Sequence, residues 1–163
     1  MKYGLILALL TVTTVNLQAQ DKNISITNLK KEKINAATPI KDQGNTGTCW
    51  SFSTTSLVES EGLRKGIPEL DLSEMFTARN IYIDKAKNYV RRQGAARFDE
   101  GGLGHDVIHA MAAYGIVPES IYSGLNGKFV HNHSQMVKEL KSYLDTLLAH
   151  RPVAENWEDR FTA

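Results

Sequence analysis

Apolar residues recur every three or four positions in four stretches of the chain, which is the spacing of an amphipathic helix. The clearest stretch begins near Ser134 and ends near His150, two residues before Pro152, which cannot continue a helix. Its apolar positions are Met136, Val137, Leu140, Leu144, Leu147 and Leu148. We therefore predict a helix over this stretch.

Three other stretches show the same periodicity: Cys49 to Leu63, about Ser73 to Arg92, and about Gly104 to Tyr114. Gly66 and Gly115 follow the first and third of these stretches. Glycine often ends a helix because it adopts the left-handed backbone conformation without strain. The sequence thus predicts three more helices.

The packed face of each predicted helix follows from the same periodicity. In the first helix, the residues expected to share parts of that face are Trp50, Ser53, Leu57 and Leu63, and those expected elsewhere are Glu59, Glu61 and Arg64. In the second helix, the expected packing residues are Met75, Phe76, Ala78, Ala86, Tyr89 and Val90. Asp71 and Ser73 are candidates to cap that second helix.

Patterns typical of strands are short and few. They are confined to Ile116-Val117 and Phe129-Val130, and residues 91–104 form a loop rich in glycine and charge. The predicted fold class is therefore mainly α.

The N-terminus has the three parts of a signal peptide. Lys2 supplies the positive start, residues 5–15 the apolar core, and Ala19 a small residue before the expected cleavage site. We predict a signal peptide over residues 1–19, a flexible lead-in over residues 20–37, and one domain over residues 38–163. The predicted location is periplasmic or secreted, with no membrane association after the signal is removed.

Charge gives little indication of a partner. Without residues 1–19 the chain has 18 basic residues (19 less Lys2) and 18 acidic ones. A balanced charge gives no argument for nucleic acid or an anionic membrane. The basic residues between Lys85 and Arg97 lack interleaved aromatic residues, so we interpret them as a solvated surface rather than a nucleic-acid site.

Cys49 is the only cysteine and follows a loop that contains Gly44 and Gly47. It stands at the start of a predicted helix, where unpaired N–H groups favour the nucleophilic thiolate. The amide of Gln43 and the N–H of Cys49 can together hold the oxyanion of an acyl-transfer intermediate. The alternative is that Cys49 is a small buried apolar residue and Gln43 an ordinary loop residue.

Gln43 and the run Gly47-Thr48-Cys49-Trp50-Ser51-Phe52 resemble the active-site segment of papain-like cysteine peptidases. Further segments of the family's pattern follow in order: Leu72-Ser73-Glu74, Gly101-Gly102, Tyr114-Gly115-Ile116 and Ile121-Tyr122-Ser123-Gly124. The resemblance covers about residues 38–125. It implies the helical N-terminal lobe of the family's fold, with the β-rich second lobe missing from this sequence.

The resemblance also implies roles for single residues. Cys49 and Gln43 would be catalytic, and peptide would be the substrate. The residues implied to bind substrate are Gly47, Trp50, Gly101 and Gly102. The family needs neither a metal nor an organic cofactor.

Two departures from the family's pattern point to one of its branches. Thr46 and Thr48 replace the first cysteine and the small residue of the usual local signature. A cysteine-poor lobe and an enlarged region before Gly101 are more similar to the bleomycin hydrolase and aminopeptidase C branch, as is Pro118-Glu119-Ser120. That branch implies an aminopeptidase, with homo-oligomerisation of the full-length enzyme as an open alternative.

The sequence offers no obvious partner base for Cys49. In papain-like enzymes the histidine and asparagine lie roughly 130–150 residues beyond the cysteine, whereas 114 residues follow it here (163 − 49). The histidines of the chain are His105, His109, His131, His133 and His150. None has the family's spacing. Asn156-Trp157 superficially resembles the family's Asn-Ser-Trp motif, but it lies within a charged helical pattern, and we do not interpret it as the catalytic asparagine segment. We therefore expect a fragment that has little peptidase activity alone.

Other functions stay open at this point. His105 and His109 lie one helical turn apart and can share a zinc ion, although no third ligand is evident. Asp99 and Glu100 can bind a positive group of a substrate or be solvated loop residues. The chain can also be a non-catalytic peptide-binding lobe or a degenerate peptidase.

Overall fold

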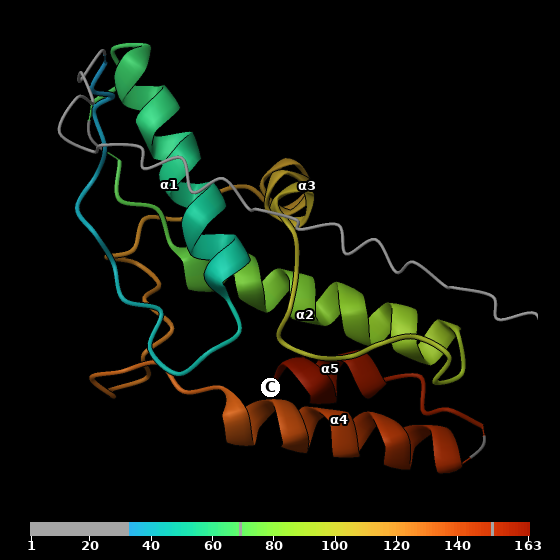
Figure 1. Cartoon of the computed structure of the whole chain (residues 1–163). Coiled ribbons are helices and arrows are strands. Elements are labelled where there is room, and N and C mark those ends of the chain that lie inside the picture. The colour runs from blue at the N-terminus through green and yellow to red at the C-terminus, as the bar shows by residue number, and fades with distance from the viewer. Residues whose placement is uncertain (1–32, 69, 151) are drawn as a thin grey trace, which may run out of the picture. The chain divides into compact units, whose positions relative to one another are not determined.

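A computed structural model of the chain describes residues 33–68, 70–150 and 152–163 (Figure 1). The chain separates into two units, residues 1–34 and residues 35–163, and the helices described below all belong to the second unit. The predicted signal peptide and residues 20–32 of the predicted lead-in lie outside the described residues.

The structure confirms the helical fold class and each of the four predicted helices to within one residue at either end. In chain order the helices are α1 (Cys49–Arg64), α2 (Glu74–Arg91), α3 (Gly104–Tyr114), α4 (Ser134–Ala149) and α5 (Trp157–Thr162). Where the chain is described, β-pairing is limited to isolated bridges, which join Asn45 to Asn132 and Leu72 to Pro118. No described helix combines the length and the apolar run that a membrane span requires.

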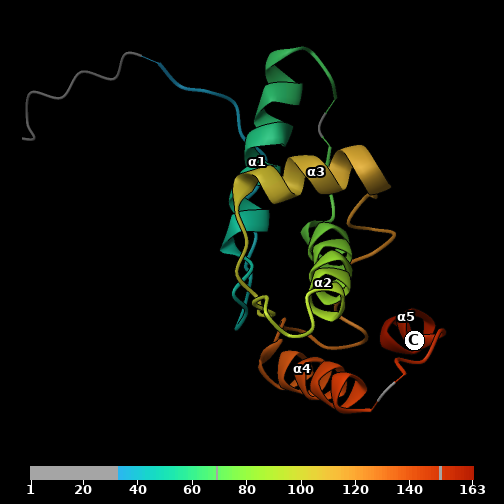
Figure 2. The ribbon, with the colours of Figure 1, turned by 90° about the vertical axis from the view of Figure 1, so that its right-hand side faces the viewer.

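The first part of the core lies where α3 crosses α1 and α2 (Figure 2). Its buried members are Trp50, Met75, Ala78, Ile81, Val107 and Ala110. Small alanine side chains on α2 and α3 let these two helices approach closely. This cluster fixes the N-terminal end of α1, where Cys49 stands.

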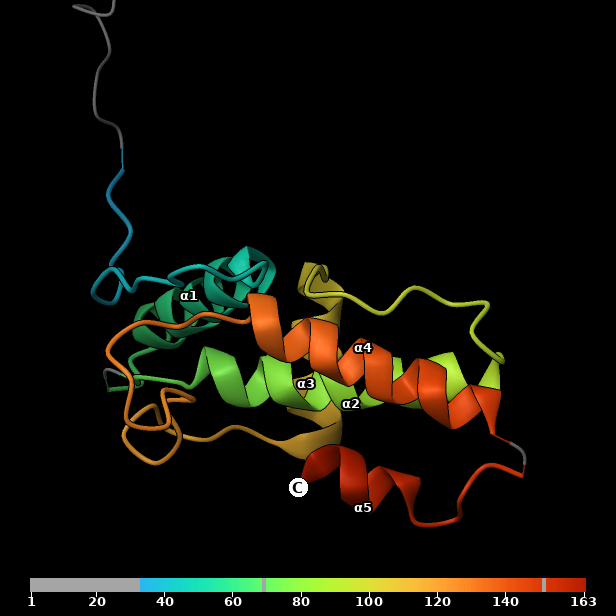
Figure 3. The same cartoon turned by 90° about the horizontal axis from the view of Figure 1, so that it is seen from below.

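A second cluster involves the C-terminal half of α2, and Figure 3 shows α4 running alongside that helix. Its buried members are Ala86, Tyr89, Val90, Phe98, Leu144 and Trp157. Trp157 therefore serves the core, and its carbonyl accepts a hydrogen bond from the Tyr143 hydroxyl at 3.1 Å. The interpretation that Asn156-Trp157 is not a catalytic asparagine segment agrees with this placement.

The packed face of α1 differs from the predicted one. Leu57 is 62% exposed, whereas Glu59, which we expected away from the packed face, is only 2% exposed. The Glu59 carboxylate accepts hydrogen bonds from the Leu72 N–H at 2.8 Å and from the Thr38 hydroxyl at 2.5 Å. Burial of a carboxylate is tolerated where it finds such partners, and periodicity cannot reveal them.

Ser73 caps α2 as predicted, because its hydroxyl accepts a hydrogen bond from the Phe76 N–H at 3.0 Å. The same residue ties a distant segment to this helix start. Its N–H donates to the Val117 carbonyl at 2.8 Å, and its hydroxyl donates to the Tyr122 carbonyl at 2.5 Å. Residues 117–122 are thereby fixed beside the first turn of α2.

Candidate active site

Cys49 is exposed and is the first residue of α1. Thr48 before it is fully buried, and its carbonyl accepts a hydrogen bond from the Ser51 N–H at 2.8 Å, which starts the helix. The N–H groups of a first helical turn have no acceptor inside the helix. The Cys49 N–H therefore remains a donor next to the thiol.

The loop before Cys49 is held by hydrogen bonds within itself. The Gln43 side-chain amide donates to the Thr46 carbonyl at 2.7 Å, and the Thr46 hydroxyl donates to the Gln43 carbonyl at 2.9 Å. An amide nitrogen carries two hydrogens, so Gln43 keeps a second donor. Thr46, at a position where the family pattern has cysteine, acts here through its hydroxyl.

Gly44 is required by the path of this loop. Its φ is 61°, and a Cβ there would lie 2.5 Å from the His131 carbonyl oxygen. The neighbouring Asn45 N–H donates to the same carbonyl at 2.9 Å. Close backbone contact with residues 131–133 thus fixes the position of the loop.

Gly102 lies against the ring of Trp50. A Cβ at Gly102 would be 2.6 Å from the ring carbon Cε2, so only glycine fits. Trp50 is 6% exposed and belongs to the first core cluster. Trp50 was predicted to bind substrate, but its ring lies in the core and packs against Gly102.

Gly101 is exposed, and the nearest atom to a Cβ there would be a carboxylate oxygen of Asp99 at 3.6 Å. A cavity of about 390 Å³ opens beside Gly101, Gly102 and Leu103. An exposed glycine backbone next to a hollow is accessible to an extended peptide.

Glu100 is a site residue whose part the sequence did not reveal. Its carboxylate accepts a hydrogen bond from the Gly47 N–H at 2.6 Å. Its carbonyl accepts one from the Trp50 indole N–H at 3.0 Å. Glu100 thus joins the glycine pair to the loop that carries Cys49, instead of facing a substrate's positive group. Its one sequence signal was an acidic residue directly before Gly101.

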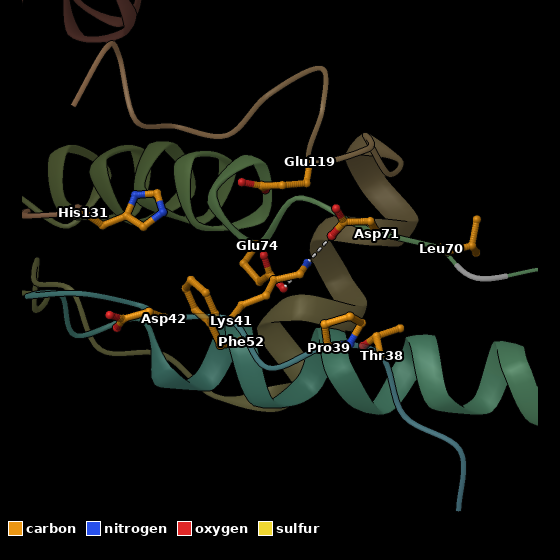
Figure 4. A pocket seen from close by; sticks show the side chains of 10 residues that line it. All are labelled: Thr38, Pro39, Lys41, Asp42, Phe52, Leu70, Asp71, Glu74, Glu119 and His131. Atoms are coloured by element: carbon orange, nitrogen blue, oxygen red, sulfur yellow. Dashed lines mark hydrogen bonds and ion pairs between the residues drawn. The ribbon is translucent and has the colours of Figure 1, made fainter. Parts of the chain in front are cut away.

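A cavity of about 520 Å³, whose lining includes Lys41, Phe52 and Glu74, does not include Cys49 (Figure 4). Lys41 lies in its wall and forms ion pairs with Asp71 and Glu74, each at 2.8 Å. Burial alone would lower the pKa of Lys41. The hydrogen bonds to these two carboxylates outweigh the effect of burial, and the pKa of Lys41 is raised. Burial raises the pKa of Glu74, and Lys41 only partly offsets this effect. The wall of this cavity thus holds a network of ion pairs, which we interpret as structural.

None of the five histidines hydrogen-bonds to Cys49 within the described residues. The Nδ1 atom of His133 pairs with the Tyr82 hydroxyl at 3.2 Å, and that of His150 with the Thr146 carbonyl at 2.8 Å. The ring of His131 packs edge-on against Phe52, with centroids 6.4 Å apart.

The zinc alternative finds no third ligand where the chain is described. His105 lies 3.3 Å from a carboxylate oxygen of Asp106, and His109 lies 3.4 Å from one of Asp84. Among these residues no group of three or more His, Cys, Asp or Glu side chains is arranged to hold a metal ion.

Comparison with known proteins points to thiol chemistry. Residues 25–147 match the family model described as papain family cysteine protease. A cathepsin L-like peptidase of Aedes aegypti is 50% identical over 42 residues, which are 26% of this chain and 12% of that protein. Cysteine proteinase 2 of Dictyostelium discoideum is 55% identical over 40 residues, 24% of this chain and 11% of the relative. Cysteine proteinase 15A of Pisum sativum is 26% identical over 127 residues, 74% of this chain and 33% of the relative.

The match with each of these relatives spans a third of the relative's length or less. The family model, in contrast, covers well over half of this chain and includes the loop of Gln43, the start of α1 and the glycine pair. With an exposed thiol at the helix start and a family match of this extent, the chain belongs to the papain family of cysteine proteases.

Proposed function

We propose that this chain supplies the nucleophile-bearing lobe of a cysteine peptidase, in which Cys49 attacks the carbonyl of a peptide bond. The observation that carries the proposal is an exposed thiol at the first residue of α1. Gln43 in the preceding loop keeps a second amide hydrogen, and the Cys49 N–H lies in the first turn of α1, so both are donors that we assign to the oxyanion. Gly101, which is exposed, and Gly102, which is partly exposed, offer backbone for an extended peptide.

In the proposed reaction, the thiolate of Cys49 attacks the carbonyl carbon, and the carbonyl electron pair becomes a negative charge on oxygen. The Cys49 N–H and the Gln43 amide donate to that oxygen. The intermediate then collapses, the C–N bond breaks, and the amine leaves with a proton. Water hydrolyses the resulting thioester and restores the thiol.

The proposal assigns the proton transfers to a histidine that is not among these 163 residues. It is supported by the histidines described above, because each has another partner and, within the described residues, none hydrogen-bonds to Cys49. The expected catalytic asparagine belongs with that histidine. We therefore propose that these 163 residues alone hydrolyse peptides slowly or not at all.

We further propose aminopeptidase specificity, as in the bleomycin hydrolase and aminopeptidase C branch. The support is the cysteine-poor lobe and the long segment between α1 and Gly101, which includes all 18 residues of α2. The names of the relatives given above do not include this specificity. Peptides with free and with acetylated N-termini distinguish the two activities: cleavage of the free form alone is expected, and equal cleavage of both contradicts it.

We also propose that the protein is exported, on the basis of the pattern in residues 1–19. N-terminal sequencing of the protein from its native source tests this point. A mature chain that begins at Gln20 is expected, and a retained Met1 or Lys2 contradicts export through this signal.

Peptide hydrolysis by the native protein, with its flanking sequence or partner, tests the proposed reaction. Cys49→Ala is expected to abolish turnover, and Gln43→Ala to lower kcat by about 100-fold or more. Unchanged hydrolysis in Cys49→Ala contradicts the proposal and indicates a non-catalytic peptide-binding lobe. Rapid turnover by residues 1–163 alone shows that the base lies within this sequence.

A further inference from the structure

Residues 99–101, directly before and within the glycine pair, are held from two sides. On one side, the Lys85 ammonium of α2 donates hydrogen bonds to the Asp99 carbonyl at 2.9 Å and to the Gly101 carbonyl. Lys85 also lies 3.7 Å from the Asp99 carboxylate. One side chain thus fixes two carbonyls that flank Glu100.

On the other side, Glu100 contacts the loop and helix start that carry the nucleophile. Its carbonyl, between the two that Lys85 holds, accepts from the Trp50 indole, and its carboxylate accepts from the Gly47 N–H. Three consecutive carbonyls therefore alternate between α2 and the start of α1. Rotation of any one of these peptide units would break the contact that its carbonyl makes with Lys85 or with Trp50.

We propose that Lys85 and Glu100 form a non-covalent clamp that positions the Gly101-Gly102 backbone relative to Cys49. Both are positioning residues, since neither needs to touch the reacting atoms. The inference rests on the proposed function only in treating the glycine pair as the wall that receives peptide. Because Cys49 is the only cysteine of the chain, no internal disulfide can join the two loops.

The environment of Lys85 explains why it stays at this position. Its side chain is 20% exposed, and burial lowers its pKa, an effect that the Asp99 carboxylate opposes. A partly desolvated ammonium needs acceptors, and the acceptors here are the two carbonyls and Asp99. Release of the loop would leave this charge without them.

Hydrogen exchange in the full 163-residue chain tests the clamp without any need for activity. Lys85→Met keeps the aliphatic stem and removes the donors, and it is expected to speed exchange of the Trp50 indole N–H and the Gly47 amide by about tenfold. Lys85→Arg is expected to restore protection. The matched control is Lys87→Met, because Lys87 lies on the same helix and pairs with Glu158 at 3.1 Å instead of the loop.

Equal exchange rates in Lys85→Met and Lys87→Met, with helix content unchanged, would overturn the clamp. If Lys85→Met does not fold, Glu100→Ala replaces it. That variant removes the acceptor of Gly47 but keeps the backbone acceptor of Trp50. Faster exchange at Gly47 and at the Trp50 indole N–H is then expected, and faster exchange at Gly47 alone contradicts the clamp.

A second readout separates the clamp from the proposed function. Cys49 is alkylated by a peptidyl electrophile and by iodoacetamide, and the ratio of the two rates reports the peptide wall independently of thiol reactivity. Lys85→Met is expected to lower the ratio by about tenfold and Lys85→Arg to restore it. If the wild type shows no preference for the peptide, the proposed function fails, and the exchange rates alone decide on the clamp.

Discussion

At the scale of single residues, the two glycines of the proposed peptide wall have different reasons to be glycine. Gly102 has no room for a side chain because the Trp50 ring occupies that space. A Cβ at Gly101 would make only an ordinary van der Waals contact, with an Asp99 carboxylate oxygen at 3.6 Å, so nothing there excludes a methyl group. Gly102 therefore serves the packing of the lobe, and Gly101 serves access to the wall.

We predict that Gly102→Ala lowers the free energy of unfolding by about 1–3 kcal/mol, because the new methyl group overlaps the indole ring. Gly101→Ala is the matched control and is expected to change this free energy by less than about 0.5 kcal/mol. Urea unfolding of the two variants provides the measurement. Equal destabilisation by both substitutions would contradict the packing role of Gly102.

Cys49, Gln43 and the glycine pair could be proposed as site residues from the sequence because they form short motifs of fixed order. Glu100 was not, because its partner Gly47 lies 53 residues earlier in the chain. Trp50 was assigned to substrate, yet its ring lies behind Gly102. Local sequence identifies chemical groups, but the direction in which each side chain points depends on distant contacts.

At the scale of elements, two parts of α1 have different roles. Its first residue is Cys49, the proposed nucleophile, and further along the helix a buried carboxylate makes hydrogen bonds and an ion pair. Glu59, near the middle of the helix, bonds to the backbone of Leu72 and to Thr38. It also lies 3.6 Å from the Lys41 ammonium. The helix is therefore held by polar contacts where we expected the apolar Leu57 to pack.

We predict that Glu59→Ala lowers the free energy of unfolding by about 3 kcal/mol, because it leaves the buried Leu72 N–H without an acceptor and removes a charge beside Lys41. The matched control on the same helix is Glu61→Ala, because the ion pair that Glu61 forms with Arg64 lies on the surface. Thermal unfolding should separate the two variants. Similar midpoints for both would show that the buried network does not stabilise α1.

Helix periodicity predicted α1 to α4 well because each has 11 residues or more. The six residues of α5 are too few to show a period, although they extend a charged helical pattern. The two bridges depend on single residues of segments far apart in the sequence. A pairing between residues so far apart in the chain has no local signature.

At the scale of the whole molecule, buried and partly buried titratable groups act on stability in opposite directions. Burial lowers the pKa of His131 and His133 from the ordinary 6.5, so the unfolded chain binds protons first as the pH falls. Burial raises the pKa of Glu74 and Glu119 from the ordinary 4.5, so the folded chain binds protons first. The histidines therefore lower stability as the pH falls below 6.5, and the two carboxyl groups oppose this loss.

We predict that His133→Gln reduces the loss of stability between pH 7.5 and pH 5.5. The neutral amide retains a polar contact with Tyr82 but takes up no proton in the unfolded chain. The measurement is urea unfolding of wild type and variant at both pH values. An identical pH dependence in the two proteins would show that His133 does not contribute to it.

The central claim is that Cys49 is a nucleophile and that the Gly101-Gly102 backbone, which Glu100 joins to the loop and helix start around Cys49, receives peptide. The most direct measurement is its alkylation rate by a peptidyl electrophile, divided by its rate with iodoacetamide and compared with the same ratio for N-acetylcysteine. Because the chain has one cysteine, the mass of the adduct locates it at Cys49. A ratio well above that of N-acetylcysteine is predicted, and an equal ratio would contradict the account.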